Sequence, residues 1–409
     1  MKLRPHERPK DHGVYPLSAD VDRHVRRVAK AHPDLVKVKR VIRSVQGRPI
    51  WAVTVTDPKV SSVDKQHALV VGGQHGNEES GRAVALALID WLTTKAAAET
   101  RRKQTVVVMP NISPDACERD QYINVKGVNP NRDHAVSGPT SPEGEALEIV
   151  ARRLRPELFI DLHACGGAGC GVDIVLYPDG RRWTEDEWVL RHMADDMTAA
   201  GERAGIPQQT FPLSWWGVTD ISSNSSSVYL YRNFKTLELL TENTESNTHT
   251  WTLRDRVRAG LAKVKAALRW GNRRFPKLYY PGYPTMLAAG QFVRGVMSVG
   301  KTAAARRQSR VDIWRNVAKF DGLGLANPQE AKRQRLTLKY SGARLRRGVG
   351  VQLAARGRLR VKSATLNGRR LKRSETSGYT TWHHGAATYT VVVVRDLRRG
   401  KHEIEIVYA

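Results

Sequence analysis

The stretch Ala68-Leu69-Val70-Val71-Gly72-Gly73-Gln74-His75-Gly76-Asn77-Glu78 decides the fold of this chain. Its first half is a short, uninterrupted apolar run, which is typical of a strand buried on both faces. After Glu79, apolar side chains recur at a helical spacing, at Val84, Leu88, Trp91 and Leu92. The segment between them is therefore a strand-to-helix turn at the carboxyl edge of a sheet, where open α/β folds bind ligands.

A second buried strand ends in another histidine. The run Leu158-Phe159-Ile160-Asp161-Leu162-His163 reaches the same sheet edge if its strand lies parallel and adjacent to the first. Two histidines and one glutamate are a ligand set of catalytic zinc, which keeps a fourth position for water. We therefore expect one Zn²⁺ per chain, bound by His75, Glu78 and His163. The alternative is an ordinary helix N-terminus at which Glu78 complements the helix dipole and His75 is solvated.

Further phrases follow in a fixed order along the chain. Together with the ligand turn and the Asp-Leu-His strand, they resemble the zinc metallocarboxypeptidase family typified by carboxypeptidase A. The resemblance runs from the N-terminus to about Trp270. The phrases are Ala31-His32-Pro33-Asp34-Leu35-Val36, Ser44-Val45-Gln46-Gly47-Arg48-Pro49-Ile50-Trp51, Met109-Pro110-Asn111-Ile112-Ser113-Pro114-Asp115-Ala116 and Gly127-Val128-Asn129-Pro130-Asn131-Arg132-Asp133-His134.

This resemblance implies a fold and an activity. The fold is a three-layer α/β/α catalytic domain with a mixed central sheet. The activity is hydrolysis of a C-terminal peptide bond, or a peptide-like amide bond, through a metal-bound water and a glutamate general base. Within the same fold, an amidase or deacylase is an alternative.

The family keeps its general base near the end of a later strand. Here the candidate strand, Lys235–Asn243, contains both Glu238 and Glu242, and side chains four residues apart share one face of a strand. We favour Glu242, because it lies nearer the carboxyl edge of the sheet.

The resemblance also implies substrate contacts. Asn131 and Arg132 would hold the free carboxylate of the substrate, since a planar guanidinium binds a carboxylate through paired hydrogen bonds. Arg119 most plausibly corresponds to the arginine that stabilises the oxyanion. Tyr229 and Tyr231 are both candidates for the tyrosine that caps the substrate.

Asn129 departs from the family pattern. Members often carry an aspartate at this position, where it accepts a hydrogen bond from a zinc-ligating histidine. An amide oxygen also accepts this bond but stabilises the metal-bound state less, so zinc affinity or activity is expected to differ.

The composition changes after the first 275 residues. We expect a catalytic domain at 1–275, a connecting segment at 276–330 and a small basic all-β, sandwich-like domain at 331–409. Asn367-Gly368 predicts a hairpin turn in the last of these. The β-like runs are Leu336–Tyr340, Val349–Leu353, Leu359–Lys362, Thr388–Val394 and Ile404–Tyr408.

Charge is concentrated in this last segment. Residues 331–409 contain 19 Lys and Arg and 4 Asp and Glu, a net charge of +15 within a total of +27. Such a domain attracts polyanions, so contact with a polyanion is a second expectation. The basic domain and the departure at Asn129 together suggest an alternative function: a catalytically weakened relative that binds a polyanion or the cell wall.

The remaining features concern the compartment. No stretch of the sequence is apolar enough over its length to span a membrane, and Met1–Arg8 lacks the apolar core of a signal peptide. The expected location is the cytoplasm as the sequence stands, or outside the cell if a leader has been removed. Cys165 and Cys170 are close enough in sequence to pair, but a cytosolic chain would keep them as free thiols.

Overall fold

The computed structural model divides the chain into two units, Met1–Asn272 and Arg273–Ala409. Each unit is described by itself. The structure describes residues 15–60, 65–165, 172–178, 187–216, 223–234, 236–244, 251–272, 317–323, 333–340, 344, 349–374, 378–384, 387–394, 396 and 398–409.

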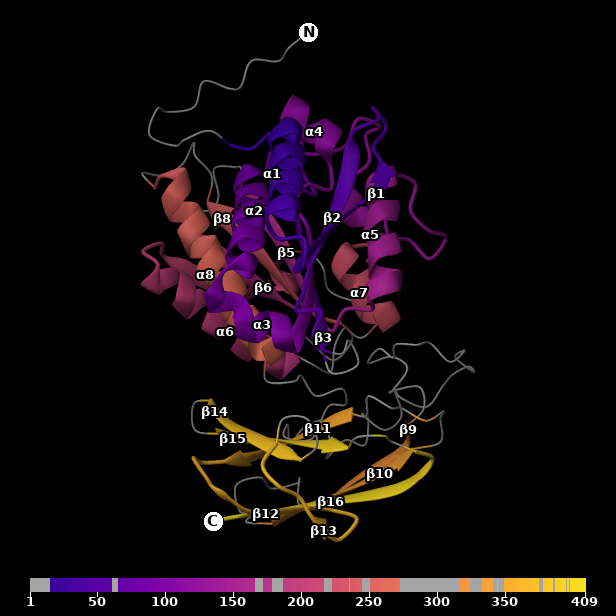
Figure 1. The fold of residues 1–409 in the computed structure, drawn as a ribbon, viewed down its shortest axis with the longest axis vertical. Coiled ribbons are helices and arrows are strands. Elements are labelled where there is room, and N and C mark those ends of the chain that lie inside the picture. Colours follow the sequence, from indigo (N-terminus) through magenta and orange to yellow (C-terminus); the bar gives the residue numbers. More distant parts are fainter. Residues whose placement is uncertain are drawn as a thin grey trace. The chain divides into compact units, whose positions relative to one another are not determined.

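The first unit is built around an eight-stranded sheet in the order β1-β2-β4-β3-β5-β8-β6-β7 (Figure 1). Its central strands β4, β3, β5 and β8 are parallel, whereas β2 pairs antiparallel with β1 and β4, and β6 pairs antiparallel with β8. The mixed sheet is the one predicted. The strands are β1 (Val36–Arg43), β2 (Pro49–Val55), β3 (Gln66–Gly72), β4 (Gln104–Met109), β5 (Leu158–Cys165), β6 (Asp173–Tyr177), β7 (Gln208–Pro212) and β8 (Leu237–Thr244).

Helices cover both faces of this sheet, which makes the three layers visible in Figure 1. Helices α1, α2, α3, α6 and α8 pack with one another on one face, and α5 and α7 lie on the other. The helices are α1 (Ser18–Ala31), α2 (Glu79–Thr93), α3 (Ala98–Lys103), α4 (Pro114–Arg119), α5 (Pro142–Leu154), α6 (Glu187–Arg203), α7 (Ser226–Phe234) and α8 (Leu253–Asn272), with short 3₁₀ turns η2 (Lys95–Ala97), η3 (Pro130–Arg132) and η4 (Leu213–Trp216).

The central strands are buried along their whole length. Every residue of β3 and of β8 is buried, as the continuous apolar run at Ala68–Val71 predicts for a strand covered on both faces. Strands β3, β5 and β8 are neighbours and run in the same direction, so their carboxyl ends meet at one edge of the sheet.

Two glycines let α2 approach this edge. A methyl group on Gly81 would overlap the main-chain carbonyl of Leu162 in β5, and one on Gly72 would press on the carbonyl of Gly81. Backbone of the helix thus lies directly against backbone of the strand. This close approach brings the start of α2 to the residue that follows Leu162, which is His163.

The second unit consists of two antiparallel sheets, so the predicted sandwich-like class is found. A five-stranded sheet has the order β13-β12-β16-β10-β9 and a three-stranded sheet the order β11-β15-β14. The strands are β9 (Val317–Leu323), β10 (Arg333–Tyr340), β11 (Val349–Arg356), β12 (Val361–Leu366), β13 (Arg369–Arg370), β14 (Tyr379–His384), β15 (Ala387–Val394) and β16 (Gly400–Tyr408).

Two details of this unit bear on the sequence prediction. Asn367 and Gly368 join β12 to β13 with positive φ values of 51° and 77°, as a tight hairpin turn requires. Strand β9 pairs with β10 although it lies in the segment 276–330 that the sequence suggested was a connection. The second unit therefore contains sheet structure before residue 331.

A Gly81→Ala substitution tests the contact between α2 and β5. We expect a loss of about 1–3 kcal/mol in the free energy of unfolding, because the added methyl group overpacks a backbone contact. In a helix without this contact, the same change is stabilising by up to about 1 kcal/mol. Urea unfolding of the two proteins measures the difference, and an equal or more stable variant would contradict the argument.

Candidate metal centre

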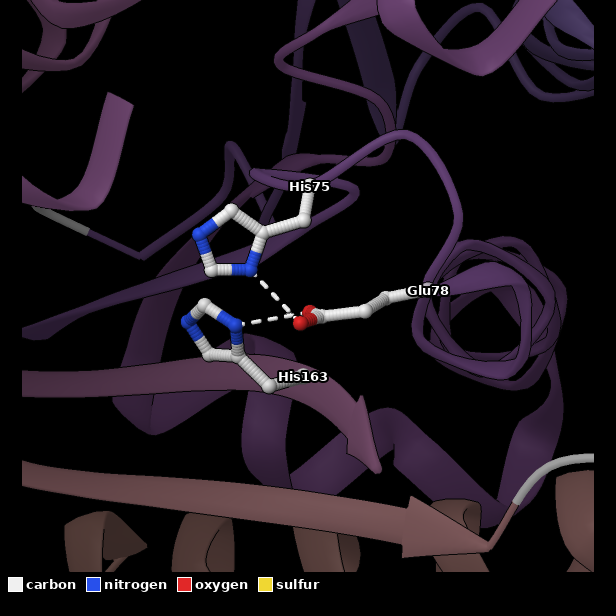
Figure 2. A group of neighbouring side chains, drawn as sticks. All are labelled: His75, Glu78 and His163. Carbon is white, nitrogen blue, oxygen red and sulfur yellow. Dashed lines mark hydrogen bonds and ion pairs between the residues drawn. The ribbon is translucent and has the colours of Figure 1, made fainter. Parts of the chain in front are cut away.

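Three buried side chains converge at the carboxyl edge of the sheet, from three different elements. His75 comes from the turn after β3, Glu78 from the N-terminus of α2 and His163 from β5 (Figure 2). His75 Nδ1 lies 2.6 Å from Glu78 Oε1, and His163 Nδ1 lies 2.7 Å from Glu78 Oε2. The atoms that could bind a metal ion lie within 4.8 Å of one another. The structure thus brings together the three residues that the sequence suggested.

Glycines shape the turn that carries His75. Gly73 has a φ of +64°, a conformation that favours glycine. A methyl group on Gly76 would overlap the backbone of Ala116 in α4, so only glycine allows the turn to pack there. Gly76 N also donates to the carbonyl of Gln121 (2.8 Å), which fixes the turn against the segment that follows α4.

The second nitrogen of each imidazole has its own acceptor. His75 Nε2 donates to Asn129 Oδ1 (3.0 Å), and His163 Nε2 donates to Asp161 Oδ2 (2.9 Å). The Nδ1 atom of each ring faces Glu78 and is the atom that would bind a metal ion. Two imidazoles and a carboxylate are a donor set that fits Zn²⁺.

The charges around the centre are strongly coupled. Burial would raise the pKa of Glu78, but His163 and His75 together lower it to about 2. Burial would lower the pKa of His163, yet the carboxylates of Asp161 and Glu78 raise it well above its ordinary value. In the metal-free protein, a negative Glu78 therefore attracts positive charge to the position between the two rings.

The two candidate glutamates of β8 occupy different positions. Glu242 pairs in register with His163, whereas Glu238 pairs with Phe159, four residues nearer the amino end. Burial and then the charge of Glu78 raise the pKa of Glu242 to about 8, with His163 acting in the opposite direction. Glu242 is thus the glutamate close to the three ligand-type residues.

Glu238 lies deep in the sheet instead. It is 1% exposed, and neither of its carboxyl oxygens has a hydrogen bond of good geometry to the described part of the chain. Burial raises its pKa well above the ordinary value, and the nearby Ser227 hydroxyl offsets this only in part. Glu238 is therefore favoured in its protonated form.

Asn131 and Arg132 lie in η3, beside the metal centre. Asn131 is buried; its Nδ2 lies 3.2 Å from His163 Nε2, and its Oδ1 accepts from the Ser226 hydroxyl (2.7 Å). Arg132 is exposed, and one guanidinium nitrogen donates to the carbonyl of Asn131 (2.9 Å). The Asn131 side chain is thus occupied by protein groups, whereas Arg132 faces solvent.

The other expected substrate contacts lie on α7 and α4. Tyr229 and Tyr231 lie on α7 and are 7% and 1% exposed, so neither ring is available to cap a substrate. Tyr231 belongs to an apolar core cluster, and Tyr229 packs against His134. Arg119 is exposed at the end of α4. The burial of the two tyrosines depends on how α7 packs, and the sequence offered no basis for choosing between them.

The sequence reading missed the polar groups behind the ligands. Asp161 Oδ2 accepts from His163 Nε2 and also from Gln74 Nε2 and the Ser226 hydroxyl. The signal was present, because residues two apart on a strand share a face and Asp161 precedes His163 by two. Gln74 and Ser226 gave no local signal.

A buried ion pair supports the strand that carries Glu242. Lys263 of α8 and Asp173 of β6 are both fully buried, with 2.7 Å between Lys263 Nζ and Asp173 Oδ2. Asp173 Oδ1 accepts from the backbone N–H of Thr244, the last residue of β8 (2.7 Å). The positive charge of Lys263 also lowers the pKa of Glu242, against the larger effects of burial and of Glu78.

The cysteines differ from expectation. Cys165, at the end of β5, takes part in a disulfide bond, and Cys117 is a buried free thiol. The expectation of a free thiol was therefore wrong for Cys165. Cys170 lies outside the described residues.

Sequence comparison agrees with this geometry. A model of the zinc carboxypeptidase family matches residues 21–165, which include the metal centre and η3. Residues 21–165 are thus similar to the zinc carboxypeptidase family. Carboxypeptidase D of Rattus norvegicus is 28% identical over 192 residues, which cover 42% of this chain and 13% of that protein. Carboxypeptidase 2 of Trichophyton tonsurans is 29% identical over 202 residues, covering 44% of this chain and 37% of that protein.

Solved structures show the same fold for the first unit. Bovine thrombin-activatable fibrinolysis inhibitor, solved with a tick carboxypeptidase inhibitor, matches with a TM-score of 0.53 and 16% identity, covering 64% of this chain and 99% of that one. A metallo-carboxypeptidase from Burkholderia cenocepacia matches with a TM-score of 0.52 and 20% identity, covering 62% and 68%. The predicted fold class is confirmed. The chain spans well under half the length of the curated relatives above.

Within the described residues, no helix combines the length and apolar character needed to cross a membrane.

A Glu238→Gln substitution tests the protonation of this buried carboxyl. An unfolded glutamate titrates near a pKa of about 4.3, and the folded protein raises this pKa. Its contribution to stability is therefore complete below about pH 4 and is lost as the pH rises through the folded-state pKa. Glutamine mimics the protonated form, so the variant should gain stability over wild type between pH 5 and pH 8. Urea unfolding of both proteins at pH 5 and pH 8 measures the difference in stability. A difference that does not change with pH would contradict the raised pKa of Glu238.

Proposed function

We propose that this protein is a zinc-dependent carboxypeptidase. The observation that carries the proposal is the buried trio His75, Glu78 and His163, with both Nδ1 atoms directed at one carboxylate. These residues would hold one Zn²⁺ per chain. The family match over residues 21–165 supports the same activity.

Zinc in such a site polarises the scissile carbonyl and lowers the pKa of bound water to about 7. Glu242 is proposed as the general base that takes a proton from this water and returns it to the leaving amine. Its register opposite His163 supports that role over Glu238. Lys263 and Asp173 would hold the end of β8, and thereby Glu242, in place.

The substrate is proposed to be a peptide, or a peptide-like amide, with a free carboxylate. Arg132 is exposed beside the metal centre and keeps guanidinium N–H groups beyond the one bound to Asn131 O. Paired hydrogen bonds from these groups suit a carboxylate. Asn131 would link η3 to β5 and α7, because its amide contacts His163 and Ser226. Arg119 stays a proposal for stabilising the oxyanion.

A Glu242→Gln substitution tests the base. We expect kcat to fall by about 10²–10⁴-fold with little change in KM, because glutamine accepts no proton from water. The measurement is release of C-terminal amino acids from a mixed set of peptides by zinc-loaded protein.

Matched controls make this experiment decisive. Glu238→Gln makes the same substitution at the other buried glutamate of this strand and should retain activity, since Glu238 lies away from the trio. Peptides with an amidated C-terminus should be poor substrates because Arg132 has no carboxylate to bind. Equal activity of wild type and Glu242→Gln would exclude Glu242 as the base. Release from amidated substrates alone would favour an amidase.

We further propose that the second unit binds a phosphate-bearing polyanion through residues 358–373, the basic stretch that includes the β12–β13 hairpin. This stretch has no acidic residue, and its basic side chains are all exposed: Arg358, Arg360, Lys362, Arg369, Arg370, Lys372 and Arg373. Some cations elsewhere in the unit are paired with acids: Arg335 contacts Glu405, and Lys401 contacts Glu403 (2.6 Å).

The chemistry of the basic stretch favours phosphates. Five of its seven cations are arginines, whose guanidinium groups bind phosphate oxygens in pairs. The stretch has no aromatic side chain on which a base could stack. Contacts would therefore be to the backbone of a nucleic acid, without sequence preference. Lysine and arginine at a sheet edge also prevent edge-to-edge association, which is the competing explanation.

A charge-matched pair of variants separates a binding site from net charge. The hairpin variant changes Arg369, Arg370, Lys372 and Arg373 to Gln. The control changes four ion-paired cations to Gln: Arg335, Arg344, Arg398 and Lys401. Binding to a short DNA duplex is measured as a function of salt.

The hairpin variant should bind more weakly, with a salt slope smaller by about 3–4. The control removes the same number of cations but should bind more tightly than the hairpin variant at every salt concentration. If the two variants lose the same affinity for DNA, binding depends on net charge and not on the hairpin. Binding to anionic vesicles but not to DNA would point to a membrane surface instead.

The Cys165 disulfide supports an oxidising compartment, because the cytoplasm keeps thiols reduced. Of the two expected locations, we propose the one outside the cytoplasm.

A further inference from the structure

The phenol ring of Tyr122 lies on the imidazole of His75. The ring centroids are 3.8 Å apart and the planes differ by 25°, so the two rings are stacked. His75 is 3% exposed, whereas Tyr122 is 48% exposed. Tyr122 therefore covers one face of a buried ligand-type histidine and exposes the rest of its own surface to solvent.

Two contacts fix Tyr122 in this position. The carbonyl of Gln121, the preceding residue, accepts from the backbone N–H of Gly76, which follows His75 (2.8 Å). Asn129 Nδ2 lies 3.4 Å from the Tyr122 hydroxyl, while Oδ1 of the same amide accepts from His75 Nε2 (3.0 Å). The amide of Asn129 thus touches both stacked rings at one end.

The hydrogen bond to Asn129 and the stacking on Tyr122 restrain different motions of the His75 ring. A hydrogen bond at Nε2 fixes one point of the imidazole but leaves the ring able to tilt about that point. Stacking opposes this tilt, because tilting would separate the two ring faces. The second constraint matters here because a neutral amide holds the imidazole N–H less strongly than a carboxylate.

We propose that Tyr122 is a positioning residue for His75. Its ring holds the imidazole plane so that Nδ1 points at Glu78, and Tyr122 and Asn129 together preorganise a ligand that a carboxylate often orients alone. The inference rests on the proposed zinc site. It concerns metal affinity, so its test does not depend on which substrate is cleaved.

The test compares zinc affinity in the full-length chain, measured by competition with a chromophoric chelator. Tyr122→Ala removes the ring and should weaken zinc binding by about 10–100-fold, the range for residues that orient a metal ligand. Tyr122→Phe keeps the ring and should bind zinc as wild type does. Ile123→Ala truncates the neighbouring exposed side chain and should also have no effect. A circular-dichroism melt of each apo-protein checks the fold.

Two results would overturn the proposal. Wild-type affinity in Tyr122→Ala would show that the ring does not position His75. Equal weakening in Tyr122→Phe would assign the effect to the hydroxyl and Asn129 rather than to stacking.

A double-mutant cycle adds a second criterion. In an Asn129→Asp background the carboxylate should orient His75 by itself, so Tyr122→Ala should cost less affinity than in wild type. An unchanged cost would mean that the two residues act independently, contrary to the proposal. Absence of zinc binding in wild type would overturn the metal centre itself. Tight zinc binding without peptide hydrolysis would overturn the proposed activity and leave this inference standing.

Discussion

The carboxylate of Glu78, shared between His75 and His163, is the interaction on which the first unit depends. A buried carboxylate is costly unless it is paired, and both of its oxygens here face an imidazole nitrogen. The pairing requires α2 to begin directly against β5, which only Gly81 permits. It also requires β3 and β5 to be parallel neighbours, so that His75 and His163 reach the same edge.

A second layer of polar groups connects the segments around this centre. Asp161 accepts from His163, from Gln74 beside His75 and from Ser226 at the start of α7. Asn131 joins the same group from η3. These hydrogen bonds join buried side chains from four segments, so the network fixes side-chain orientation. On the far side of β8, the Asp173–Lys263 pair holds the strand end that bears Glu242.

The second unit distributes its charge unevenly. On the five-stranded sheet, Glu405 contacts Arg333 and Arg335, and Glu403 contacts Lys401. Residues 358–373, on and beside the edge strand β13, hold seven exposed cations and no acidic residue. The net charge alone suggests a diffuse basic domain, whereas the pairing of β12 with β13 brings part of this charge together in one hairpin.

The sequence by itself determined the trio and the fold class. Both signals are local. An apolar run marks each buried strand, and ligand-type residues at the ends of two such strands come together when the strands are parallel neighbours. The resemblance alone suggested that Asn129 accepts from a ligand-type histidine, and in the structure it accepts from His75 Nε2.

Only the tertiary structure decided the features that depend on long-range packing. Strand periodicity puts Glu238 and Glu242 on one face, and it took the register of β8 against β5 to separate them. The burial of Tyr229 and Tyr231 follows from how α7 packs, and the stacking of Tyr122 on His75 joins segments that no spacing links. The pairing of β9 with β10 was likewise not predictable, because a sequence pattern records which residues are apolar or charged but not which ones meet. The close spacing of Cys165 and Cys170 allowed a disulfide, but only the structure shows that Cys165 forms one.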